Sequence, residues 1–112
     1  MKIEVKNGVA IIYSTDAGSA LDLMATVRHE TGCSSIAIQK SSVSEDFFVL
    51  STGVAGEILQ KFVNYHTRLA IIGEYSHYTS KALQDFIYES NQGSHIFFAA
   101  NEQSAIDKLS IL

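Results

Sequence analysis

Carboxylates follow three of the predicted strands, and they are the side chains with the clearest chemical potential. Asp16, Asp46 and Glu74 each lie in the loop after a predicted strand. Converging carboxylates could hold Mg²⁺, or one of them could accept a phosphoryl group. A phosphoryl-accepting site also needs a lysine after the last strand, and residues 99–102 contain none. The sequence therefore favours the alternative, that these are loop and helix-capping carboxylates.

The histidines and the single cysteine lack the spacing of metal ligands. His29, His66 and His95 are predicted at the opposite edge of the sheet from the carboxylates, and no pair has the short separation typical of zinc sites. His29 and His66 are predicted near helix C-termini, where the helix dipole favours a protonated imidazole, so a structural role is enough to account for them. Cys33 is predicted at the start of a strand, where a small buried residue is common, so we expect a structural role for it. We expect no metal, no cofactor and no catalytic residue.

Two hydroxyl side chains, Ser51 and Thr52, precede a predicted helix. Free backbone N–H groups at a helix start favour an anion, so a phosphate on either hydroxyl would be stabilised there. The simpler role is N-capping, which local physics favours. Gly53 and Gly56 near this start are not followed by the lysine of a phosphate-binding loop.

Length and charge limit the class of protein. A chain of 112 residues with 46% hydrophobic and 18% charged residues predicts one domain over residues 1–112. The net charge is −4 and the eight Lys and Arg residues are scattered, which argues against nucleic acid as a partner. The charged start of the chain does not resemble a signal peptide, and no apolar run approaches membrane-spanning length. We expect a cytoplasmic protein without a membrane partner.

Apolar periodicity switches repeatedly between strand and helix spacing. The predicted strands are 2–6, 9–13, 35–39, 69–72 and 96–99, and the predicted helices are 17–31, one from about 54, 79–91 and one after Asn101. Asn7-Gly8 predicts a type I′ hairpin turn. The stretch 14–16 offers caps for the first helix, and Gly32 fits its left-handed end. The order is ββαβαβαβα.

This order predicts an α/β fold with a mostly parallel five-stranded sheet packed with helices. Strands two to five should be parallel through right-handed crossovers, with strand one antiparallel beside them. The loops that follow parallel strands gather at one edge, where open α/β sheets usually bind ligands. That edge would hold Asp16, Ser44, Glu45, Asp46, Glu74, Tyr75, Ser76, His77 and Asn101.

Phe47-Phe48-Val49-Leu50 is an apolar run between a polar loop and a helix start. Four adjacent apolar residues cannot all face one core if the segment is extended, so we expect an exposed aromatic ring to anchor an interface. The alternative is that both rings are buried between sheet and helix. The predicted contact with a protein partner, or with a second copy in a homo-oligomer, comprises Ser44, Glu45, Phe47, Phe48, Ser51, Thr52 and Gly53.

Several segments resemble the bacterial family known as domain of unknown function 4180. They include Ser19 to Met24, Ser44 to Phe48, Leu50 to Phe62, Leu69 to Gly73, Tyr78 to Lys81, Asp85 to Glu89 and His95 to Phe98. The resemblance covers nearly the whole chain. It implies a family but no activity.

More distantly, Ser51-Thr52-Gly53-Val54 is similar to the Asp-Ser-Ser-Gly-Leu signature of STAS domains, which include antagonists of anti-sigma factors. The resemblance implies a STAS-like fold in which a kinase partner phosphorylates Ser51 or Thr52. Leu50 stands where the signature has its aspartate.

The sequence thus predicts a non-enzymatic binding or regulatory module, acting through protein contacts in bacterial signalling or transcription control. The alternative is a small enzyme or ligand-binding domain that uses the carboxylates at the strand ends. Convergent side chains around a deep pocket would favour this alternative, and a flat surface around Phe47 to Gly53 would favour the module.

Overall fold

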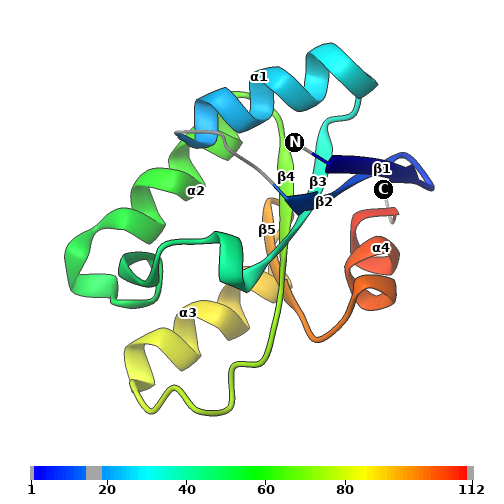
Figure 1. Cartoon of the computed structure of the whole chain (residues 1–112). Coiled ribbons are helices and arrows are strands. Elements are labelled where there is room, and N and C mark those ends of the chain that lie inside the picture. Colours follow the sequence, from blue (N-terminus) through cyan, green and yellow to red (C-terminus); the bar gives the residue numbers. More distant parts are fainter. Residues whose placement is uncertain (1, 15–18, 111–112) are drawn as a thin grey trace.

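The computed structural model of the chain describes residues 2–14 and 19–110 (Figure 1). Its strands are β1 (Lys2–Lys6), β2 (Val9–Ser14), β3 (Ser35–Gln39), β4 (Arg68–Ile72) and β5 (Ile96–Ala99). Its helices are α1 (Ala20–Thr31), α2 (Val54–Asn64), α3 (Lys81–Gln92) and α4 (Glu102–Ser110). Three 3₁₀ turns join β3 to α2: η1 (Lys40–Ser42), η2 (Glu45–Phe48) and η3 (Leu50–Thr52). The predicted order of strands and helices is confirmed.

The five strands form one sheet in chain order, β1-β2-β3-β4-β5. β2 to β5 are parallel and β1 is antiparallel to β2, as predicted. Asn7 and Gly8 have φ values of 52° and 77°, which the type I′ turn between β1 and β2 requires. Each strand from β3 onward adds to the same side of the sheet, so right-handed crossovers place α1, α2 and α3 on one face.

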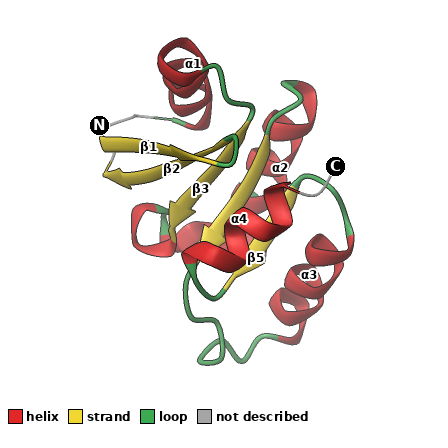
Figure 2. Ribbon diagram, turned by 90° about the vertical axis from the view of Figure 1, so that its right-hand side faces the viewer, coloured by secondary structure: helices red, strands yellow, loops and turns green. Residues whose placement is uncertain are grey.

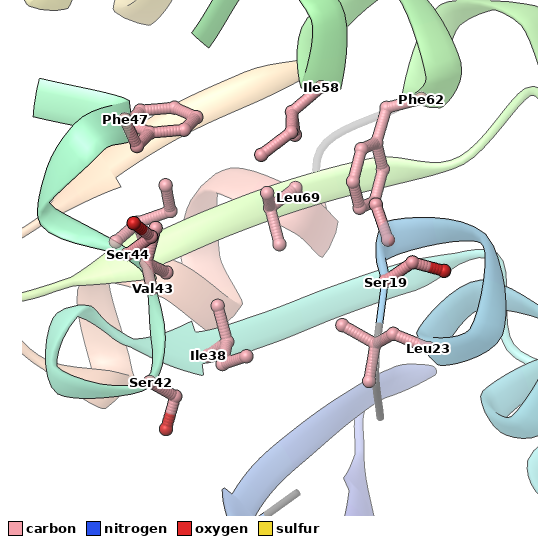
Figure 3. A pocket seen from close by; sticks show the side chains of 12 residues that line it. Ser19, Leu23, Ile38, Ser42, Val43, Ser44, Phe47, Ile58, Phe62 and Leu69 are labelled. Atoms are coloured by element: carbon pink, nitrogen blue, oxygen red, sulfur yellow. The ribbon is translucent and has the colours of Figure 1, made fainter. Parts of the chain in front are cut away.

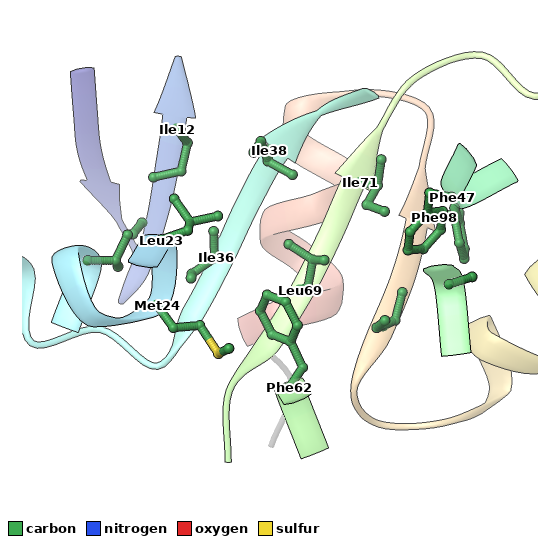
Figure 4. Close-up of a cluster of buried hydrophobic side chains, with 14 of the residues drawn as sticks. Ile12, Leu23, Met24, Ile36, Ile38, Phe47, Phe62, Leu69, Ile71 and Phe98 are labelled. Carbon is green, nitrogen blue, oxygen red and sulfur yellow. The ribbon is translucent and has the colours of Figure 1, made fainter. Parts of the chain in front are cut away.

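Two hydrophobic cores lie on the two faces of the sheet. On the first face, Ile36 and Ile38 of β3 join a cluster with Leu23 of α1 and Phe62 of α2 (Figure 4). On the second face, Ala37 of β3 packs in a separate cluster with residues of α4. Figure 2 shows α4 lying across the strands on this second face, and it contacts β2, β3, β4 and β5. Because successive side chains of a strand point to opposite faces of the sheet, the strands contribute residues to both cores.

The start of α1 differs from the prediction. The helix begins at Ala20, and the side chain of Ser19 accepts a hydrogen bond of 3.2 Å from the backbone N–H of Asp22. Of the predicted caps, Ser14 ends β2 and is therefore not the cap, and Thr15 and Asp16 lie outside the described residues. The hydroxyl of Ser19 thus reaches the third residue of the helix, as an N-capping side chain does. Gly32 ends α1 with φ 74°, as predicted.

The helices of the described part are short. Each has between nine and twelve residues. Within residues 2–14 and 19–110, none combines the length and the apolar character needed to cross a lipid bilayer.

Candidate binding site

The segment between β3 and α2 folds as a chain of 3₁₀ turns, and this geometry buries both of its aromatic rings. Ser44 starts η2 by accepting a hydrogen bond from the N–H of Asp46. Phe47 is then 0% exposed and Phe48 3% exposed. The expected exposed aromatic anchor is therefore wrong. The segment is not extended, and both rings join the core cluster on the first face of the sheet, with Phe48 beside the loop after β4.

Ring contacts show where the two side chains lie. The ring of Phe47 is 5.0 Å from that of Phe48 and 6.1 Å from that of Phe98 on β5. The ring of Phe48 stacks on Tyr78 at 5.3 Å. Phe47 therefore joins the segment to the sheet, and Phe48 joins it to the loop that leads into α3.

The outer side of the segment carries the remaining predicted contact residues. Ser44, Glu45, Ser51, Thr52 and Gly53 are exposed. Val49 belongs to the same apolar run but is not among the predicted contact residues, and half of its surface is exposed. The apolar feature on this surface is thus a valine, whereas both phenylalanines face inward.

Thr52 braces the segment but is not the N-cap of α2. Its single hydroxyl proton is shared between the carbonyl oxygens of Asp46 at 2.7 Å and Val49 at 2.8 Å, and its oxygen accepts from the N–H of Val54 at 3.3 Å. The N-cap is Gly53, in the left-handed region at φ 79°, with no capping side chain. The prediction that Ser51 or Thr52 caps the helix is therefore wrong, because the turn η3 directs the Thr52 hydroxyl back toward η2. Both residues face solvent, as expected.

Glu45 is held in an ion pair at the edge where the carboxylates were predicted. It lies 3.1 Å from the Lys40 ammonium and accepts from the Tyr78 hydroxyl at 3.2 Å. The Lys40 ammonium also lies 4.8 Å from the centre of the Phe48 ring. Hydrogen bonding to Lys40 lowers the pKa of Glu45, and interaction with Tyr78 raises that of Lys40. A Cβ on Gly73 would lie 2.7 Å from the Lys40 Cβ, so this arrangement requires glycine there.

Glu74 is engaged within its own loop. Its carboxylate accepts from the backbone N–H and hydroxyl of Ser76 and lies 3.0 Å from Nδ1 of His77. These contacts, the Ser76 hydroxyl first, lower its pKa to about 2. Tyr75 in this loop donates to the carbonyl of Ile71 at 2.8 Å, and burial raises the pKa of its hydroxyl.

Among the described residues, Glu45 and the loop of Glu74 are linked at one edge of the sheet, because Tyr78 donates to Glu45 and its ring lies 4.1 Å from that of His77, the partner of Glu74. Asn101 caps α4, as predicted, by accepting from the N–H of Ser104. His29 and His66 are exposed near helix ends, and Cys33 is partly buried. Within the described residues, no three His, Cys, Asp or Glu side chains are placed to hold a metal ion. Asp16 lies outside those residues.

A cavity that sequence reasoning missed lies on the first face of the sheet, between α1, α2 and the turns after β3. Its volume is about 250 Å³. Figure 3 shows Phe47, Ile58 and Phe62 facing Leu69 and Ile38 across this space. The described residues that line it are Ser19, Ala20, Leu23, Ile38, Ser42, Val43, Ser44, Phe47, Ile58, Phe62, Leu69 and Ile71.

The lining divides into an apolar floor and a hydroxyl-bearing rim. Ile38, Leu69 and Ile71 of the floor are at most 5% exposed, whereas the rim residues Ser19, Ser42 and Ser44 are exposed. None of the described lining residues is charged. Two signals pointed to this place without predicting a cavity: the small residues Ser19 and Ala20 start α1, and serines flank Val43. The arrangement can hold an apolar group and offer hydroxyls at its entrance.

A profile of the family described as domain of unknown function DUF4180 matches residues 3–109. The match spans nearly all of the chain, so the protein belongs to this family, as the resemblance of its segments predicted. No curated protein matches the chain. No solved structure matches it either.

Proposed function

We propose that the protein is a non-catalytic binding module that takes a small, neutral, largely apolar molecule into the cavity between α1 and α2. The observation that carries the proposal is the cavity itself, with buried apolar side chains as its floor and serines at its rim. Ligand sites in proteins typically combine an apolar lining with a few polar groups that orient the ligand.

The lining determines the class of ligand. Burying an ionised group away from a partner is costly, and the described lining residues offer no counter-charge. At the packing density of proteins, a cavity of this volume holds roughly ten non-hydrogen atoms. The preferred ligand is therefore a compact hydrocarbon or aromatic body with at most one or two hydrogen-bonding groups, which would meet Ser19, Ser42 or Ser44.

The state of the carboxylates favours binding over catalysis. Glu45 is paired with Lys40, and Glu74 is bound to Ser76 and His77. Neither carboxylate lines the cavity. Among the described lining residues, a ligand seated between α1 and α2 would thus meet hydroxyls and apolar groups but no acidic or basic side chain.

The test uses 2-naphthol as a fluorescent neutral probe and 2-naphthalenesulfonate as its charged counterpart. We expect the wild type to bind the neutral probe and to discriminate against the anion. Ile58→Phe adds a ring to the cavity wall and should weaken binding about tenfold or more. Ile87→Phe makes the same change on α3, outside the cavity lining, and should leave binding unchanged. Equal binding of both probes, or equal loss in both variants, contradicts the proposal.

A second candidate is docking of a protein partner on the outer surface of Ser44–Gly53, and the half-exposed Val49 favours it. The STAS-like character of the domain, its cytoplasmic bacterial setting and a role in signalling or transcription control belong to this candidate. Ser51 is the better phosphorylation site of the two hydroxyls, because the Thr52 hydroxyl proton is already shared between two carbonyl oxygens.

The second candidate is tested with a candidate kinase and mass spectrometry. Phosphate on Ser51, lost in Ser51→Ala and retained in Thr52→Ser, supports it. Phosphate that remains in Ser51→Ala, or none on the segment, contradicts it.

A further inference from the structure

The two edge strands of the sheet differ in how their outer backbone groups are used. On β5, the outward N–H of Phe98 donates to the side-chain oxygen of Asn91 at 2.8 Å. On β1, no described residue hydrogen bonds to the outer side of the strand. An unpaired edge of this kind is a template for another strand. β1 is thus the open edge of the described sheet.

The hairpin determines which groups of β1 point outward. Lys6 pairs with Val9 across the two-residue turn, and Glu4 pairs with Ile11. The pair that closes such a turn is hydrogen-bonded, and bonded pairs alternate along an antiparallel ladder. Lys6 and Glu4 therefore direct their N–H and C=O groups toward β2. Ile3 and Val5 lie between these positions, so their backbone N–H and C=O groups point to the open edge of the sheet.

We propose that β1 pairs antiparallel with β1 of a second copy of this chain, with the twofold axis at Val5. In this register Glu4 lies directly opposite Lys6 of the second copy, and the reverse pair forms on the other side of the axis. Cross-strand pairs of opposite charge stabilise a sheet, and like charges opposite each other destabilise it. The neighbouring register, centred on Glu4, would place Glu4 against Glu4 and Lys2 against Lys6.

The side chains of β1 suit this contact. Val5 is 50% exposed, and the twofold axis would bring it against Val5 of the second copy. The side chains of Glu4 and Lys6 are 52% and 47% exposed, so both can reach across. The ammonium of Lys6 lies 2.7 Å from Glu102, which holds it on the α4 side of the sheet. The proposed dimer is a continuous sheet with α4 helices on one face.

Sedimentation equilibrium of the full chain over a range of concentrations tests this pairing. A contact of two short strands is small, so the wild-type dimer should dissociate at roughly micromolar or higher concentration. Glu4→Lys and Lys6→Glu each place like charges opposite one another and should weaken the dimer about tenfold or more. The double exchange Glu4→Lys with Lys6→Glu restores opposite charges and should restore the dimer.

Three controls separate the register from net charge and from folding. Glu57→Lys and Lys61→Glu make the same charge changes in a surface pair of α2 and should have no effect. Glu102→Gln removes the ion pair of Lys6 with α4 and should also leave the dimer intact. Circular dichroism must show each variant folded. A wild type that stays monomeric at millimolar concentration overturns the proposal. So does a dimer that the single exchanges leave unchanged, or that the double exchange fails to restore.

Discussion

The two faces of the sheet are covered by different numbers of helices and are packed differently. On the α4 face, Ala37, Ala70 and Ala99 are small and almost fully buried, and one helix crosses four strands. On the other face the strands carry isoleucine, leucine and phenylalanine, and three helices share the surface. The 3₁₀ segment borders the space between α1 and α2, and a cavity that is open to solvent remains there. The α4 face also buries Ile11, Ile72 and Phe97, so the two faces differ chiefly in how many helices cover them, and the pocket lies on the face that three helices share.

The largest expected effect is the loss of a side chain from the closely packed face. Ile106→Ala removes a side chain of α4 that is 4% exposed. Because its neighbours cannot collapse into the gap, it should lower the free energy of unfolding by about 2–5 kcal/mol. Ile87→Ala, on a half-buried position of α3, is the matched control and should cost less. Urea unfolding measures both, and equal costs would contradict the contrast between the faces.

Larger side chains should also affect the two faces differently, with the greater loss of stability on the α4 face. Ala70→Leu overfills the α4 face and should cost about 1–3 kcal/mol or more. Ile58→Phe enters the cavity and should cost less than about 1 kcal/mol, or stabilise the protein. Thermal unfolding with calorimetry compares them. A greater loss in Ile58→Phe than in Ala70→Leu would show that the cavity side has no spare room.

The segment that walls the cavity depends on one hydroxyl. Thr52→Ala removes the donor shared by the carbonyls of Asp46 and Val49 and should cost about 1 kcal/mol. Ser51→Ala changes an exposed side chain next to it and should cost about 0.5 kcal/mol or less. Chemical unfolding tests the pair. If Ser51→Ala is the more destabilising of the two, Thr52 does not brace the turns.

The smallest expected effect is a dependence of the melting temperature on pH under acidic conditions. The pKa of Glu74 is lowered to about 2 from an ordinary value of 4.5, so its ionised form is bound more favourably in the folded state. Its contribution is fully present above about pH 4.5 and is lost as the pH falls toward 2. Glu74→Gln should flatten the fall of the melting temperature in this window, and Ser76→Ala should flatten it partly. A slope unchanged in both variants would refute this assignment.

The fold could be predicted from the sequence because its signals are local. Asn7-Gly8 specifies the turn, and the alternation of strand and helix periods specifies the parallel order. The burial of Phe47 and Phe48 could not be predicted in the same way. It depends on a 3₁₀ path that turns one ring toward β5 and the other toward Tyr78, residues distant in the chain. The pattern of four adjacent apolar residues does not distinguish this path from an extended one.

The candidate site was even less visible in the sequence. The polar residues that drew notice, Glu45 and Glu74, are engaged in pairs at the rim of the sheet. The cavity is lined by residues such as Leu23, Ile58 and Leu69, which read as ordinary core positions. A cavity arises from the spacing of helices, and no single residue encodes that spacing.

The most direct test of the binding cavity is NMR of methyl-labelled protein titrated with 2-naphthol. We expect intermolecular nuclear Overhauser effects from the probe to the methyl groups of Leu23, Ile58 and Leu69. We expect none to Ile106 or Leu109, which pack on the α4 face. Contacts to those two residues, or no contact to the cavity methyls at millimolar probe, would contradict the claim that this protein binds a small neutral molecule between α1 and α2.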